Sequence, residues 1–156
     1  MMKILMLGWE LPPHNSGGLG VACLNMARAL SSQGAQIDFV VPYSAEHPGI
    51  DFMKILPATS LDPIHRYGGG AYSSIKITEK LIPSPSNGAP TLSIRDVQKT
   101  YCDFIEEYLK KHHPDLVHAH DWLTYEAGVL AKKKYKIPLI AHVHATEYDR
   151  AGMHYG

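Results

Sequence analysis

The feature that most constrains the fold of this chain is an alternation of short apolar runs with stretches of helical periodicity. An apolar run at 3–7 is followed by a glycine-rich turn, by apolar residues spaced three and four apart from residue 19, and by a second apolar run at 37–41. Continuous apolar runs are typical of parallel strands that are buried on both faces. A strand, a glycine turn, a helix and a strand in this order predict a βαβ unit.

The same alternation returns in the second half of the chain. Ser93 is the expected N-cap of a helix whose apolar stripe ends before Pro114, with Lys110 and Lys111 expected in its last turn. Three further elements are expected: a strand at 116–119, a helix at 122–134 and a strand at 138–143. The pattern predicts an α/β protein with a doubly wound, Rossmann-like parallel sheet.

The stretch from 43 to 90 is less regular. It is rich in proline, glycine and serine, and it holds only two short strand-like pieces, at 53–56 and 74–78. The alternation around the second piece suggests a hairpin or an edge strand. A chain of 156 residues without an internal repeat fits one domain.

Composition excludes several classes of partner. Fifteen basic and fifteen acidic residues give a formal net charge of zero, which argues against a nucleic-acid or anionic-membrane surface. The N-terminal apolar run lacks a signal cleavage site, and no run is long enough for membrane insertion. Cys23 and Cys102 lie in helical patterns and are expected as buried thiols, with a disulfide as the lesser alternative. These features predict a cytoplasmic globular domain.

Three of the predicted strands end in polar or glycine-rich motifs. These motifs are WELPPHNSGGLG at 9–20, HAHDW at 118–122 and HVHATEYDRAG at 142–152. In open α/β sheets, ligands bind beyond the carboxyl ends of the strands, where the strand order reverses. The three motifs therefore predict a functional site at that edge of the sheet.

The glycine turn has two interpretations from its residues alone. Gly17, Gly18 and Gly20 would let a phosphate approach the backbone at the start of a helix. Alternatively, the glycines serve a tight turn that needs positive φ. The turn is not the dinucleotide fingerprint, because Cys23 stands where the third glycine of GxGxxG belongs.

Four histidines lie near two of the strand ends. His118 and His120 share one face of their strand by the period of two, as do His142 and His144. Such a group can form a zinc site, but the loops lack the further acidic and histidine ligands of metal hydrolases. His118 and His142 are expected as core residues bonded to the backbone, whereas His120 and His144 lie nearer the strand tips.

Two residues follow the third strand directly. Asp121 is either an N-cap of the next helix or a group that bonds a substrate hydroxyl or orients a histidine. Trp122 is either a core residue or a flat wall for a sugar ring.

Together, GGLG, HAHDW and HVHATEYDRAG resemble the N-terminal domain of GT-B glycosyltransferases, and most of all that of the glycogen and starch synthases. The resemblance implies retaining transfer of a sugar from a nucleotide-sugar donor, such as ADP- or UDP-glucose, to a glucan or other saccharide acceptor. It implies no cofactor and no obligatory metal. It also implies a second, nucleotide-binding domain, so that residues 1–156 would be an incomplete N-terminal domain, inactive alone and prone to self-association.

The resemblance also assigns roles to individual residues. Gly17 and Gly18 would contact the donor diphosphate. Asp121 and His144 would be the catalytic residues, with His144 beside the transferred sugar.

His120, Trp122 and Asn15 would line the substrate wall. Asn15 stands where bacterial glycogen synthases of this type have a lysine, which favours a broader relative. Two other classes stay open at this point: a metal-dependent hydrolase built on the two HxH pairs, and a non-catalytic binding domain of the same fold.

Overall fold

The computed structural model describes residues 1–15, 17–61 and 93–150. Within these ranges the elements are, in order, β1 (Lys3–Leu7), α1 (Gly18–Ser32), β2 (Gln36–Val41), β3 (Lys54–Pro57), α2 (Ile94–Leu109), β4 (Leu116–His120), α3 (Trp122–Tyr135), β5 (Leu139–His142) and α4 (Glu147–Arg150). The alternation of strands and helices predicted from the sequence is confirmed.

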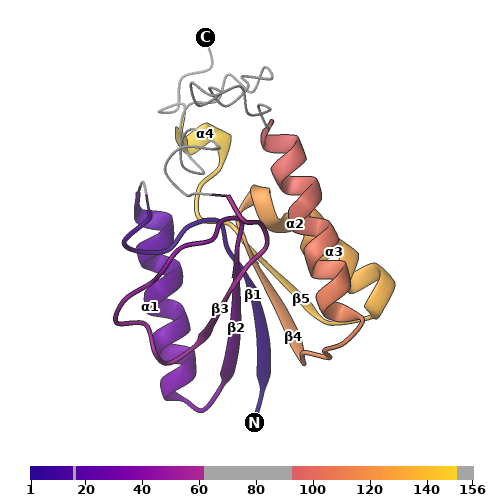
Figure 1. Ribbon diagram of the computed structural model, residues 1–156, viewed down its shortest axis with the longest axis horizontal. Helices are drawn as coiled ribbons and strands as arrows, with labels where there is room; N and C mark the ends of the chain where they lie inside the picture. Colours follow the sequence, from indigo (N-terminus) through magenta and orange to yellow (C-terminus); the bar gives the residue numbers. More distant parts are fainter. Residues whose placement is uncertain (16, 62–92, 151–156) are drawn as a thin grey trace.

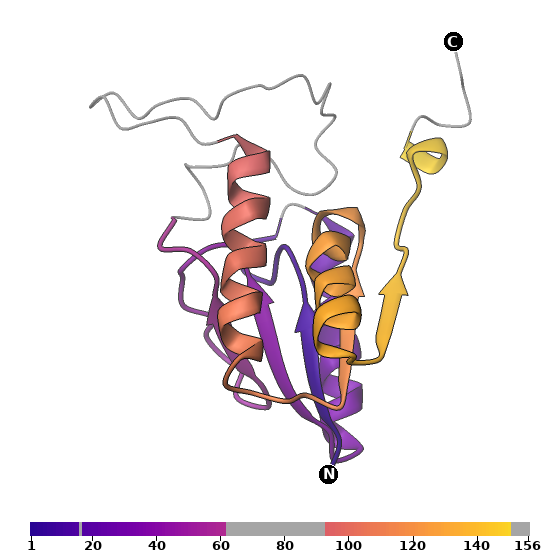
Figure 2. The ribbon, with the colours of Figure 1, turned by 90° about the vertical axis from the view of Figure 1, so that its right-hand side faces the viewer.

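The strands form one parallel sheet in the order β3-β2-β1-β4-β5. Helix α1 lies on one side of the sheet, and α2 and α3 lie side by side on the other (Figures 1 and 2). The chain runs outward from β1 to β3 and then returns to place β4 on the other side of β1. The strand order therefore reverses between β1 and β4, which is the position where doubly wound sheets bind ligands.

Helix α2 begins as predicted but ends earlier. Ser93 is its N-cap and forms a capping box with Asp96, in which each side chain accepts a hydrogen bond from the other residue's backbone N–H. The helix ends at Leu109, so that Lys110 is the C-cap and Lys111 lies beyond the helix. The prediction that both lysines lie in the last turn is therefore wrong.

The irregular stretch after β2 contains the first of its two predicted strand pieces. Strand β3 pairs in parallel with β2 and is an edge strand of the described sheet. The second piece, at 74–78, lies outside the described residues. Strand β5 is shorter than predicted at both ends, and the single turn of α4 that follows it was not predicted.

Buried aromatic residues anchor the carboxyl end of β1. Tyr101 of α2 is fully buried, and its hydroxyl lies 3.0 Å from the carbonyl oxygen of Gly8 and 3.1 Å from that of Val40. The backbone N–H of Leu11 donates to the hydroxyl of Tyr43 at 3.0 Å. These bonds hold the segment after β1 against the sheet.

The two cysteines differ in their surroundings. Both are free thiols, and Cys23 is buried as predicted, whereas Cys102 is only half-buried because it lies at the side of α2. In the part of the chain that the structure describes, no helix combines the length and apolar character that crossing a bilayer requires.

Candidate functional site

Sheet register brings the three motifs to one edge. Leu7 of β1 pairs with Ala119 of β4, and His120 of β4 pairs with His142 of β5. Because paired residues of parallel strands point to the same face, the histidines of β4 and β5 share one face of the sheet. That face also receives the side chain of Cys23 from α1.

The glycine turn leads into α1 without left-handed backbone. Gly17 is the N-cap with an extended backbone (φ −164°, ψ −159°), and Gly18 is the first helical residue. Neither is among the described residues of positive φ, so the interpretation that they serve a turn needing positive φ is wrong. A Cβ placed on either glycine meets none of the described residues within 4 Å. Relative to that part of the chain, the start of α1 is therefore open.

Gly20 differs from its two neighbours because it is enclosed. A Cβ on Gly20 would lie 2.8 Å from the Cβ of Asn15 and 3.1 Å from the carbonyl oxygen of Glu10. The Gly20 N–H donates to the carboxylate of Glu10 at 3.3 Å, and Asn15 donates its amide to the carbonyl of Gly17 at 3.0 Å. Glu10 is buried and sequence reasoning missed it, because nothing in its local pattern marks a buried acid.

The four histidines contact one another in pairs. His118 Nε2 lies 3.2 Å from His142 Nδ1, and His120 Nδ1 lies 2.9 Å from His144 Nε2. The rings of His142 and His144 stack at 4.3 Å between centroids. His118 is buried as predicted, whereas His142 is half-buried. Among the described residues their rings contact each other and not the backbone that was predicted, because the β4–β5 register places the rings of neighbouring strands side by side.

The surroundings of His118, His120 and His144 favour the neutral form of each imidazole. Burial, with the neighbouring histidines, lowers the pKa of His118 to about 4 and that of His120 to about 2. Burial likewise lowers the pKa of His144. His120 Nε2 has no hydrogen-bond partner among the described residues, and a buried unpaired N–H costs about 1–3 kcal/mol. The proton of His120 is therefore favoured on Nδ1, where it is donated to His144.

Asp121 connects the ends of β4 and β5. Its carboxylate does not cap α3 but accepts the backbone N–H of His144 at 3.3 Å, and its own N–H donates to the carbonyl of His142 at 2.9 Å. Asp121 is thus the N-cap residue of α3 by position, as one interpretation predicted, but its side chain does not make the capping bond. Asp121 also has φ 65° and ψ 170°, a region that is almost restricted to glycine and costs about 1–3 kcal/mol. Such strain is typical of functional sites.

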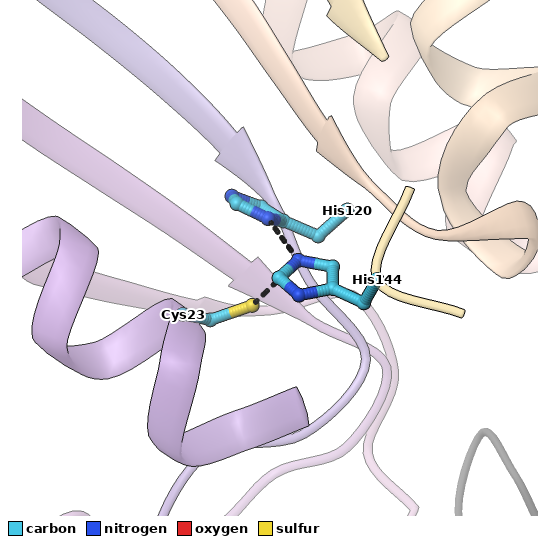
Figure 3. A group of neighbouring side chains, drawn as sticks. All are labelled: Cys23, His120 and His144. Atoms are coloured by element: carbon cyan, nitrogen blue, oxygen red, sulfur yellow. Dashed lines mark hydrogen bonds between the residues drawn. The ribbon is translucent and has the colours of Figure 1, made fainter. Parts of the chain in front are cut away.

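Cys23 is the site residue that sequence reasoning placed only in the core. Its Sγ lies 4.0 Å from His144 Nε2, and Figure 3 shows the sulfur pointing toward the rings of His120 and His144. Burial, together with the charges of Glu10 and Asp121, raises the pKa of the thiol to about 12. Cys23 and His144 are 121 positions apart in the sequence, so no local pattern links them.

Trp122 begins α3 and is the predicted wall residue with the weakest tie to this cluster. It is half-buried and packs against the hydrophobic core, and its buried Nε1 has no hydrogen-bond partner in the described ranges. The structure therefore gathers His120, Asp121 and His144, and it joins Asn15 to the glycine turn.

Comparisons with known proteins agree with this architecture. Residues 16–156 match the model of Glycosyltransferase Family 4. The chain is 26% identical over 153 residues to an uncharacterized glycosyltransferase of Methanocaldococcus jannaschii, covering 97% of this chain and 33% of that protein. It is 27% identical to a glycogen synthase of Mycobacterium tuberculosis, covering 99% of this chain and 36% of that protein.

Solved structures show the same fold. The sucrose-phosphate synthase of Thermosynechococcus elongatus superimposes with a TM-score of 0.60 at 13% identity, over 96% of this chain and 35% of that one. This chain thus spans about a third of the length of the curated relatives it matches. The family match covers the glycine turn and both histidine strands, and the chain belongs to Glycosyltransferase Family 4 as an N-terminal domain of the GT-B type.

Proposed function

We propose that this chain forms one wall of the cleft of a retaining glycosyltransferase, which moves a sugar from a nucleotide-sugar donor to a glucan or other saccharide acceptor. The observation that carries the proposal is the meeting of three motifs at the carboxyl edge of the sheet. Asp121 bonds the backbone of His144, and the ring of His144 contacts α1, which begins at the glycine turn. One rigid edge thus presents both an open helix start and a fixed polar group.

The glycine turn would hold the donor diphosphate. No residue that the structure describes occupies the space where side chains of Gly17 and Gly18 would stand, and Gly17 has no side chain with which to cap the first N–H groups of α1. Backbone N–H groups and the positive end of the helix dipole bind phosphate oxygens well. Charge that develops on the leaving diphosphate would be stabilised there by fixed donors.

His144 and Asp121 would lie beside the transferred sugar and take part in the reaction there. The ring of His144 is held by His120 and Cys23, and its backbone is held by Asp121. His144 Nε2 already accepts a hydrogen bond from His120 Nδ1. His144 would therefore act through the fixed position of its ring and through its remaining polar groups. His120, Trp122 and Asn15 would shape the wall around it.

For the donor and the acceptor we propose only a chemical class. ADP- or UDP-glucose is the proposed class of donor, with no bound cofactor and no metal required for transfer. The comparisons do not favour the alternatives of a hydrolase built on the HxH pairs or of a non-catalytic domain. Full activity would need the second, nucleotide-binding domain.

The test is the variant His144→Ala in the full-length gene product. We expect a loss of transfer per folded molecule. The variant should still fold, because His144 is half-buried and lies outside the hydrophobic core, although removing the partner of His120 Nδ1 should cost about 1–3 kcal/mol. His113→Ala, at an exposed histidine, is the matched control. Unchanged turnover per folded molecule in His144→Ala would refute the role. The anomeric configuration of the product, followed by NMR, tests retention separately.

A further inference from the structure

A cluster of soft metal-binding groups lies on the sheet face beneath α1. Cys23 comes from α1, His120 ends β4 and His144 follows β5 (Figure 3). His120 Nδ1 lies 2.9 Å from His144 Nε2, Cys23 Sγ lies 4.0 Å from the same Nε2, and all three ligand atoms lie within 4.8 Å of one another. Three separate elements thus converge on one point. We propose that Cys23, His120 and His144 bind a zinc ion, which would release the thiol proton of Cys23 to solvent and leave the proton of His120 on Nε2.

The donor set suits zinc. Zinc favours thiolate and neutral imidazole ligands in a tetrahedral arrangement, and sites with three protein ligands keep a fourth position open. Tetrahedral zinc with ordinary bond lengths separates two nitrogen ligands by about 3.3 Å and a nitrogen from a sulfur by about 3.6 Å. The observed nitrogen–nitrogen separation of 2.9 Å is shorter than this value, the observed nitrogen–sulfur separation of 4.0 Å is longer, and the three ligand atoms all lie within 4.8 Å of one another. Binding therefore requires small adjustments of the side chains.

Buried acids around the cluster would compensate the charge of the ion. Glu10 and Asp121 are both buried, at 3% and 1% exposure, and both lie close enough to Cys23 to oppose ionisation of its thiol. A divalent cation would stabilise the thiolate and would itself be attracted by the two carboxylates.

Asp121 would also position one ligand. Its carboxylate accepts the backbone N–H of His144 at 3.3 Å, which fixes the segment that carries the ring. Groups behind the direct ligands commonly orient a metal site in this way.

A second group of histidines competes for the same ion. His118, His120 and His142 also lie within reach of one another, and the two groups share His120. We assign zinc to the group with Cys23 because a thiolate contributes a negative charge that a set of three neutral imidazoles lacks. The two assignments differ in one measurable respect, which is the sulfur ligand.

Zinc at this position would regulate transfer. It would draw His144 toward Cys23 and occupy the ring that the proposed function places beside the sugar, so zinc would inhibit the enzyme reversibly. This consequence rests on the proposed function, whereas metal binding itself does not.

The test is titration of chelator-treated protein with Zn²⁺ by calorimetry and with Co²⁺ by absorption spectroscopy. We expect one ion per chain and, with Co²⁺, a thiolate-to-metal charge-transfer band together with the intense d–d bands of tetrahedral cobalt. Cys23→Ser should bind zinc at least tenfold more weakly and lose the charge-transfer band. Cys102→Ser is the matched control, because Cys102 is the other free cysteine, and it should behave as wild type.

Three results would overturn the site: no stoichiometric zinc in the wild type, a charge-transfer band that depends on Cys102, or unchanged affinity in Cys23→Ser. Affinity lost in His118→Ala but kept in Cys23→Ser would assign the ion to the three histidines instead. If Cys23→Ser does not fold, the cobalt spectrum of Cys102→Ser still decides, because only Cys23 remains as a thiol. Stoichiometric zinc binding in the wild type, together with normal transfer in His144→Ala without zinc, would refute the proposed function and leave the metal site standing.

Discussion

Two glycines of α1 give opposite predictions when each is replaced by alanine. A Cβ on Gly20 would lie 3.1 Å from the carbonyl oxygen of Glu10 and 2.8 Å from the Cβ of Asn15, whereas a Cβ on Gly18 meets no atom of the described ranges within 4 Å. The first contact involves backbone, which cannot rotate away as a long side chain can. Gly20 is therefore required by packing, and Gly18 is not.

The expected loss can be estimated from these contacts. Overpacking against a fixed neighbour costs about 1–3 kcal/mol, and weakening the hydrogen bond from Gly20 N–H to Glu10 costs about 1 kcal/mol more. Alanine offsets about 1 kcal/mol of this through its higher helix propensity. We expect Gly20→Ala to lower the free energy of unfolding by about 1–3 kcal/mol, which is roughly 2–10 °C in Tm. Gly18→Ala should be neutral or stabilising by up to about 1 kcal/mol.

Denaturant unfolding of both variants, followed by circular dichroism, measures the difference. Titration of the full-length protein with a nucleotide-sugar donor then separates packing from function, because Gly18→Ala should weaken donor binding although the fold is unaffected. Equal stability of the two variants would refute the packing argument for Gly20. Wild-type donor affinity in Gly18→Ala would refute the phosphate role.

Three further predictions concern the core, the histidines and the sheet edge. Tyr101→Phe removes the hydroxyl that bonds the carbonyl of Gly8 and should cost about 1–3 kcal/mol in denaturant unfolding; a smaller effect would mean that water replaces the bond. The pKa of His118 is lowered to about 4 and that of His120 to about 2, so the unfolded chain binds more protons below pH 6.5 and stability should fall as pH drops from 7 toward 4. Unfolding at a series of pH values checks this, and a flat profile would contradict the buried neutral rings. Ile140 is 46% exposed on β5, one of the two edge strands of the described sheet, so light scattering should detect dimers of the 156-residue chain that Ile140→Lys shifts toward monomer; a monomeric wild type would contradict this surface assignment.

Local sequence determined the secondary structure well. The apolar runs predicted β1, β2 and β4 closely, because a strand buried on both faces needs apolar residues without interruption. Ser93 marked the start of α2, because a cap acts within one turn of the chain. The end of α2 was misplaced, since lysines near a helix terminus act through a weak dipole effect that does not specify the last residue.

The three motifs also predicted the place of the site. Parallel strands end at one edge of a sheet, so polar residues that follow several strands must gather there whatever the details of packing. This much follows from strand direction alone.

Only the tertiary structure decided how the site residues meet. The pairing of His120 with His142 is a matter of register between strands, and a shift of one residue would have sent the rings to opposite faces. The approach of Cys23 to His144 depends on how α1 packs across the sheet, over 121 positions of sequence. Asp121 adopts its strained backbone because the strand ends hold it there, with its N–H bonded to the carbonyl of His142. Residue periodicity encodes local geometry, whereas contacts between distant elements are set by the packing of the whole sheet and its helices.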